Sequence, residues 1–216
     1  MNLFISTLLE DPVLFCIITL VVVFSICLHE YFHAWTALRL GDATAADRGH
    51  LTLNPLRQMG PLSIVMFLIL GFAWGAVPVN PGVLRARNRH APAIVAAAGP
   101  TTNFGLFVIG FFFYGFLATR IPALVENEGA GTAITEIFLY LGVYNAFLCI
   151  FNLLPIPGLD GWNILTNYQP RLYRISSEFM KGMTVFLIFL LLFSTKYIFL
   201  IAIKLMDLAP DLLSAG

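Results

Sequence analysis

The stretch Cys27-Leu28-His29-Glu30-Tyr31-Phe32-His33-Ala34 lies inside a long apolar run and contains the pattern His-Glu-x-x-His. Residues four apart share one face of a helix, so His29 and His33 can direct two imidazoles at a single metal ion. Glu30 then lies beside that ion without binding it, which is the arrangement of a zinc site whose carboxylate activates a water molecule. Ionisable groups in the middle of an apolar helix are costly to bury, so we interpret these three residues as a functional site.

The composition is that of a membrane protein with several spans. The chain has 216 residues, of which 59% are hydrophobic and 11% are charged, and its mean hydropathy is +0.85. Soluble domains contain about a quarter charged residues. The length allows a single domain, residues 1–216. The formal net charge is zero, so nothing suggests a nucleic acid as a partner.

Apolar runs separated by polar segments predict an all-α fold. We expect four membrane-spanning helices, near residues 12–40, 91–119, 133–154 and 183–206, because each run is long enough to cross about 30 Å of hydrocarbon. A shorter run at 61–77 is broken by glycines, and we expect it to be re-entrant.

The polar segments beside these spans contain two strand-like patterns. Residues 51–54 alternate in polarity and stop at an Asn-Pro pair, and residues 77–80 have an extended, proline-containing sequence. Such patterns are typical of short strands. We therefore expect short β-strands near the metal site, and an edge there can bind an extended peptide by strand addition.

The distribution of positive charge favours the re-entrant interpretation of 61–77. If this segment spans the membrane, Lys and Arg are shared almost equally between the two faces. If it is re-entrant, nine lie on one face and two on the other. The positive-inside rule expects such an asymmetry. We therefore expect the N-terminus outside and the metal site toward the cytoplasm.

A zinc ion needs at least one further ligand besides His29 and His33. Asp160 follows a Pro-x-Pro break at the end of the third expected span, and it is an ionisable residue left close to the membrane zone. Four spans place Asp160 at the same depth as the two histidines, whereas five spans place it on the opposite side. Asp160 is therefore the expected third ligand.

With these residues in view, the chain resembles the site-2 protease family of intramembrane zinc metalloproteases, and more narrowly its small bacterial and archaeal members without a PDZ domain. Five segments in a fixed order carry the resemblance: His29-Glu30-x-x-His33, Leu40-Gly41-Asp42-Ala43-Thr44-Ala45, Gly49-His50-Leu51-Thr52-Leu53-Asn54-Pro55, Ala98-Gly99-Pro100-Thr101-Thr102-Asn103 and Phe151-Asn152-Leu153-Leu154-Pro155-Ile156-Pro157-Gly158-Leu159-Asp160-Gly161. Small members often carry a His and an Asp after the Asn-Pro pair, where this chain has Arg57-Gln58-Met59-Gly60.

The resemblance implies hydrolysis of peptide bonds in transmembrane protein substrates, inside the bilayer of a bacterial or archaeal cell and with one Zn²⁺ per chain. In this chemistry Glu30 takes the proton of a water molecule and passes it to the leaving amine. Asn103 and Asn152 are candidates to stabilise the oxyanion or hold the substrate backbone. Hydrogen bonding between helices is the alternative for both residues. We expect Gly99 to be a close-packing residue.

Two other classes of function use the same metal ligands. One is a zinc transporter or channel, although transporters usually contain repeated halves and the sequence shows none. The other is a membrane protein that binds zinc without catalysis. A carboxylate beside the metal, at Glu30, favours the hydrolase over both. The lipid bilayer and a transmembrane substrate are the expected partners, and the sequence leaves the oligomeric state open.

Overall fold

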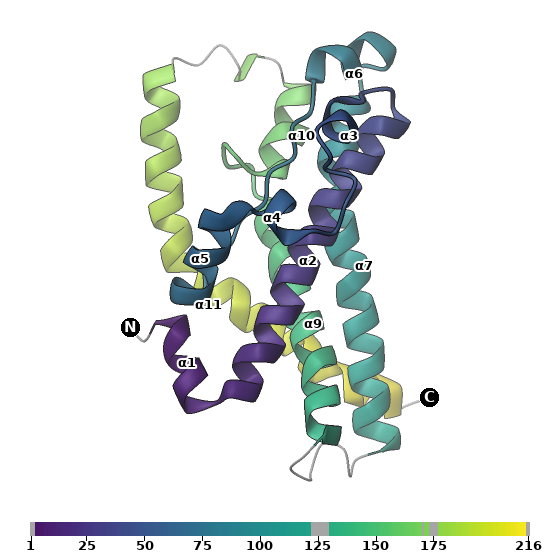
Figure 1. Cartoon of the computed structure of the whole chain (residues 1–216), viewed down its shortest axis with the longest axis vertical. Helices are drawn as coiled ribbons and strands as arrows, with labels where there is room; N and C mark the ends of the chain where they lie inside the picture. Colours follow the sequence, from purple (N-terminus) through teal and green to yellow (C-terminus); the bar gives the residue numbers. More distant parts are fainter. Residues whose placement is uncertain (1–2, 122–129, 170, 173–176, 215–216) are drawn as a thin grey trace.

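The computed structural model describes residues 3–121, 130–169, 171–172 and 177–214, with side chains left out at 130, 177–181 and 183–195. Three long helices form its centre: α2 (Pro12–Arg39), α7 (Ala91–Arg120) and α9 (Ala130–Asn152). All three pack against one another, as Figure 1 shows. Each is long and apolar enough to cross a membrane, so the chain is an integral membrane protein.

Helices α7 and α9 approach each other very closely. A Cβ atom on Gly110 of α7 would lie 2.4 Å from the backbone nitrogen of Gly142 on α9. Small residues at such crossings let two helix backbones touch, which is how membrane helices gain packing energy in the absence of a hydrophobic drive. The glycine pair therefore holds α7 beside α9 and fixes the position of the site residues that α7 carries.

Helix α11 (Ser177–Ser214) packs on the outside of this pair. Its C-terminal part runs across α9 and α7 in Figure 1, and Ala202 and Met206 form a buried cluster with Val143 and Ala146 of α9. The expected span at 183–206 lies within α11, but the side chains of its first half are outside the described set. The described residues support three candidate spans rather than the four that we expected.

The chain between α2 and α7 is built from short helices. These are α3 (Thr44–Asp47), α4 (Pro55–Gln58), α5 (Gly60–Leu70) and α6 (Pro81–Arg87), and a further helix, α1 (Phe4–Glu10), packs against α2 and α5. The eleven residues of α5 extend about 16 Å, which is half the thickness of the hydrocarbon layer. By its length alone, α5 cannot cross the membrane.

The expectation of short strands at 51–54 and 77–80 is wrong, because no residue of the described ranges belongs to a strand. A strand needs a second backbone beside it, and these segments are held by side chains instead. Gln58 Nε2 donates to the carbonyls of His50 and Thr52. The Asp42 carboxylate accepts the backbone N–H of Asn80.

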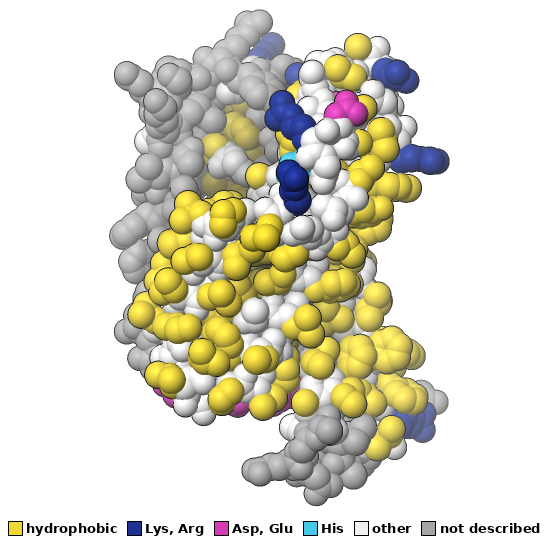
Figure 2. Space-filling model, in the orientation of Figure 1, with side chains coloured by type: hydrophobic (Ala, Val, Ile, Leu, Met, Phe, Trp, Pro, Cys, Tyr) yellow, Lys and Arg dark blue, Asp and Glu magenta, His cyan; other side chains and the backbone are white. Residues whose placement is uncertain are grey.

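Figure 2 shows hydrophobic side chains spread across the middle of the molecule, and most of the visible Lys and Arg side chains gather at the end that carries α3 and α6. The last element near the site is α10 (Asp160–Tyr168), which packs along α7. The chain turns back between α9 and α10, and Gly161 permits the turn because a Cβ there would lie 2.2 Å from the Leu153 carbonyl oxygen.

Candidate metal centre

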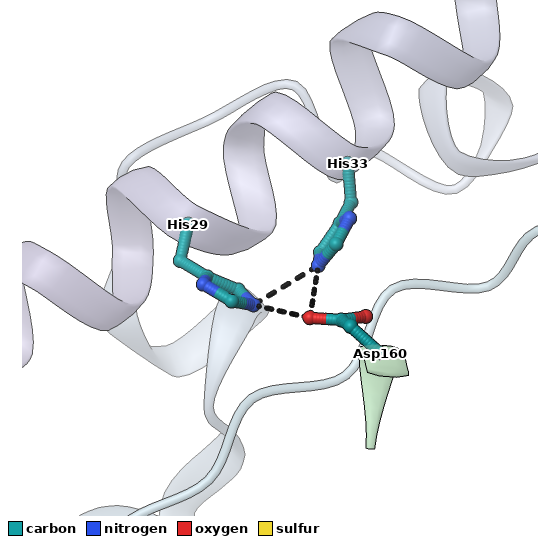
Figure 3. Close-up of side chains that lie close together, drawn as sticks. All are labelled: His29, His33 and Asp160. Carbon is teal, nitrogen blue, oxygen red and sulfur yellow. Dashed lines mark hydrogen bonds and ion pairs between the residues drawn. The ribbon is translucent and has the colours of Figure 1, made fainter. Parts of the chain in front are cut away.

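His29, His33 and Asp160 meet at one point inside the molecule, as Figure 3 shows. The two histidines project from one face of α2, and Asp160 is the first residue of α10. Asp160 Oδ2 lies 3.1 Å from His29 Nε2 and 3.3 Å from His33 Nε2, and the two Nε2 atoms are 3.0 Å apart. The structure therefore brings together all three ligands expected from the sequence.

Hydrogen bonds on the far side of each imidazole determine which nitrogen carries the proton. His33 Nδ1 donates to the Val95 carbonyl at 2.8 Å. His29 Nδ1 lies 2.5 Å from Asn103 Oδ1, which accepts in the same way. A neutral imidazole carries one N–H, so both Nε2 atoms present lone pairs toward each other.

This donor set fits a zinc ion. Two lone pairs and a carboxylate oxygen that face one another within 3.3 Å repel unless a cation lies between them. Two ligand atoms bound to a tetrahedral zinc ion are about 3.3 Å apart, given zinc–nitrogen distances of 2.0–2.1 Å. Two imidazoles and one carboxylate, with further positions left for water or substrate, are also the ligand type of a catalytic zinc site.

Asp160 lies outside the membrane-spanning helices and is ionised at neutral pH. Burial raises the pKa of its carboxyl group, but the imidazoles of His29 and His33, when protonated and donating from Nε2, outweigh burial and hold the pKa at about 2. A cation at the metal position, in place of these protons, acts in the same direction. A ligand to a divalent cation must be deprotonated. Asp160 therefore faces the metal position as a carboxylate, and no other group is needed to remove its proton.

Helix α7 supports the centre with three residues spaced four apart on one face. Val95 supplies the carbonyl for His33, Asn103 supplies the amide for His29, and Gly99 lies between them. A Cβ atom on Gly99 would lie 2.3 Å from His29 Nε2 and 2.4 Å from His33 Nε2. Gly99, the expected close-packing residue, thus packs against the two histidines that are the expected metal ligands.

Comparison with known proteins agrees with this geometry. Residues 117–194 match the family model of peptidase family M50. The chain is 34% identical over 182 residues to YwhC of Bacillus subtilis (strain 168), a candidate zinc metalloprotease by its name, and the match covers 84% of this chain and 80% of the relative. The chain belongs to peptidase family M50.

Two further relatives extend beyond the region that they share with this chain. They are proteins named Rip2, also candidate zinc metalloproteases by name, from Mycolicibacterium smegmatis and Mycobacterium tuberculosis (strain H37Rv). The first is 36% identical over 65% of this chain and 52% of the relative. The second is 35% identical over 79% of this chain and 64% of the relative. No solved structure gives a significant match.

Glu30 lies beside the expected metal ligands and is almost fully buried, with 7% of its surface exposed. The backbone of Gly75 lies directly against it, since a Cβ atom there would be 2.4 Å from Glu30 Oε1. Glu30, His29 and His33 line one cavity of about 280 Å³. The Glu30 carboxylate and the metal position therefore face the same cavity.

Residues 71–80, which we call the covering segment, lie over this cavity and are anchored at their start. Ser63 Oγ donates to the Trp74 carbonyl at 2.6 Å and accepts the Trp74 N–H at 2.9 Å. The Ala76 N–H donates to the Gln58 carbonyl at 3.1 Å. Gln58 belongs to the stretch that departs from the pattern of small family members, and its buried amide ties the 50–54 loop to the base of this segment.

The far end of the covering segment is held by Asp42, which is 1% exposed. Its carboxylate accepts the Asn80 N–H at 2.6 Å and both the N–H and the hydroxyl of Thr44. Burial raises the pKa of Asp42, but these hydrogen bonds outweigh burial and lower it. The sequence does not identify Asp42, Gln58 or Ser63 as anchors, because only the folded chain brings them against the covering segment, as Asp42 against Asn80 and Ser63 against Trp74.

The two asparagines expected at the site occupy different places. Asn103 is completely buried behind His29, and both ends of its amide are engaged, because its Nδ2 donates to Asn145 Oδ1 at 2.8 Å. Asn152 lines the cavity, and its Nδ2 donates to the Leu148 carbonyl of its own helix. The predicted roles of Asn103 and Asn152 toward substrate stay predictions. Asn145 was not found from the sequence.

Proposed function

We propose that this chain is a zinc endopeptidase that cleaves transmembrane protein substrates within the bilayer, close to the cytoplasmic face. The observation that carries the proposal is the meeting of His29, His33 and Asp160 beside Glu30. The two histidines and Glu30 belong to α2, a helix long and apolar enough to span a membrane. Membership of peptidase family M50 and the names of its relatives, which describe zinc metalloproteases, support the choice of metal and of reaction class.

In this proposal His29, His33 and Asp160 hold the zinc ion. Bound zinc supplies a Lewis acid that polarises the scissile carbonyl and makes water more acidic. Glu30 accepts a proton from water and donates it to the leaving amine. The burial of Glu30 beneath Gly75 restricts solvent around the carboxylate, so its proton passes to the substrate rather than to bulk water.

The covering segment offers a place for an extended substrate. Between its anchors at Ala76 and Asn80, the segment contributes Val77 and Val79 to the lining of the cavity. The backbone beside these two valines is proposed to pair with a peptide that has left its helical state. Asn152 lines the same cavity and is proposed to bind the substrate backbone.

We also propose a topology with four spans, the fourth at 183–206, and with α5 as a re-entrant element. Two observations support it: α5 is too short to cross the membrane, and Asp160 lies at the depth of His29 and His33. The end of the molecule at which Figure 2 shows most of the visible Lys and Arg then faces the cytoplasm. The host membrane is proposed to be that of a bacterial or archaeal cell.

The decisive experiment measures zinc content and cleavage together. Purified protein in detergent is assayed for bound zinc and for hydrolysis of a helical transmembrane peptide. Glu30→Gln should keep the metal and lose hydrolysis by about 10²- to 10⁴-fold, because it removes the general base without removing a ligand. Glu10→Gln, which changes an exposed carboxylate on α1, is the matched control and should behave like wild type.

The outcomes separate the three classes of function. Cleavage by Glu30→Gln at the wild-type rate would refute the assigned mechanism. Wild-type protein that holds zinc, cleaves nothing and moves zinc across a proteoliposome membrane would be a transporter. Zinc binding with neither cleavage nor transport would indicate a binding protein.

A further inference from the structure

Behind the metal ligands, a buried chain of hydrogen bonds links α2, α7 and α9. Asn103 Oδ1 lies 2.5 Å from His29 Nδ1, and Asn103 Nδ2 donates to Asn145 Oδ1 at 2.8 Å. Asn145 Nδ2 in turn donates to Ser25 Oγ and to the Leu141 carbonyl, both at 2.8 Å. Ser25, Asn103 and Asn145 are all 0% exposed, so water does not substitute for these partners.

The direction of each hydrogen bond in this chain follows from the Leu141 carbonyl. A backbone carbonyl can only accept, so the atom of Asn145 that faces it must be the amide nitrogen. The Asn145 oxygen then faces Asn103 and requires a donor, which places the Asn103 nitrogen on that side. Asn103 must therefore present its oxygen to His29, and His29 Nδ1 must carry the ring proton.

This order of donors leaves His29 Nε2 with the lone pair that a metal ion needs. His33 reaches the same state directly, because its Nδ1 donates to the Val95 carbonyl. We propose that Asn145 is a positioning residue of the zinc site, which acts through Asn103 to hold His29 in its metal-binding tautomer. The inference rests on the zinc site proposed above, and it gives a role to a residue that touches neither metal nor substrate.

A packing role for Asn145 makes a different prediction. A hydrogen bond that only joins α7 to α9 would stabilise the helix pair whichever way the two amides point. The tautomer of His29 depends on their orientation. A positioning role therefore predicts a change in zinc affinity, whereas a packing role predicts a change in folding stability alone.

Asn145→Leu tests the proposal because leucine has a similar volume and no polar atoms. Without Asn145, the Asn103 amide is free to turn its nitrogen toward His29 Nδ1, which favours the tautomer protonated on Nε2. Zinc affinity, measured in detergent by competition with a chelator, should fall about 10- to 100-fold. Thr19→Val is the control: it removes a buried hydroxyl on α2 that has no partner among the described residues, and it should leave zinc affinity unchanged.

The same variant in an Asn103→Ala background isolates the route of the effect. If Asn145 acts through Asn103, Asn145→Leu should cause no further loss of zinc affinity in that background. Equal losses in both backgrounds would overturn the proposal. If the wild-type protein binds zinc and Asn145→Leu binds it with equal affinity, the proposal is also overturned, and the zinc site itself stands. Wild-type protein that binds no zinc would instead remove the proposed function.

A measurement on the wild-type protein covers the case in which Asn145→Leu does not fold. Nitrogen-15 NMR of metal-free, histidine-labelled protein reports which ring nitrogen of His29 carries the proton, with His29→Ala used to assign the signal. A proton on Nδ1 is the expected result. A proton on Nε2 would overturn the proposal.

Discussion

Replacement of Gly99 by alanine tests the metal centre by adding one methyl group. The new Cβ atom would lie 2.3 Å from His29 Nε2 and 2.4 Å from His33 Nε2. Non-bonded heavy atoms settle about 3.5 Å apart, so each nitrogen would have to move by roughly 1 Å. Neither ring can move freely, because α7 also holds both Nδ1 atoms through Val95 and Asn103.

A displacement of this size is far beyond what a metal site tolerates, since ligand distances normally stay within about 0.2 Å of ideal. We therefore expect Gly99→Ala to weaken zinc binding by more than about 100-fold, the upper end of what loss of an outer partner costs. The assay is zinc per protein after dialysis against a mild chelator, read together with cleavage of a transmembrane peptide.

The matched control is Gly105→Ala on the same helix, where nothing lies within 4 Å of the new Cβ atom. Alanine is favoured over glycine inside a helix by about 0.5–1 kcal/mol, so this control should keep zinc and be slightly more stable. Retention of a full complement of zinc by Gly99→Ala, at wild-type chelator resistance, would refute the ligand geometry described for α2 and α7.

Three further predictions concern the third ligand, the covering segment and the topology. Asp160→Ala should lower zinc occupancy as well as activity, whereas Glu30→Gln should lower activity alone. The folded-state pKa of Asp42 is depressed. Its contribution to stability is therefore present above the ordinary pKa of about 3.9 and is lost as pH falls through the folded-state pKa. Asp42→Ala should remove this part of the loss of stability at acid pH and should speed proteolysis of the covering segment. Single cysteines at the exposed positions Ala43 and Ala86, in a background without native cysteines, should react with an impermeant thiol reagent from the same side of the membrane.

Each of these predictions has a result that would contradict it. Full zinc retention by Asp160→Ala would remove this carboxylate from the ligand set. An acid limb and a proteolysis rate unchanged in Asp42→Ala would show that the covering segment does not depend on this anchor. Labelling of Ala43 and Ala86 from opposite sides would make residues 61–77 a true span and would contradict the proposed re-entrant topology.

The sequence predicts least about the segment between α2 and α7 and about the residues that hydrogen-bond to the metal site from behind. The alternating pattern at 51–54 is real, but a strand exists only where a second backbone pairs with it. Here the Gln58 side chain donates hydrogen bonds to the carbonyls of His50 and Thr52 instead. In the same way, nothing local to Asn145 reveals that its amide is aligned with Asn103 across two helices.

The sequence by itself determined the three long apolar helices, the helical pairing of His29 with His33 and the choice of Asp160 as their partner. These depend on local periodicity and on the cost of placing ionisable groups in a membrane, and both can be read along a single chain. The tertiary structure decided how close Gly99 lies to the ligands, what anchors the covering segment and how Asn145 is connected to His29. These depend on which polar atoms of distant segments face one another, and that is set only when α2, α7 and α9 pack.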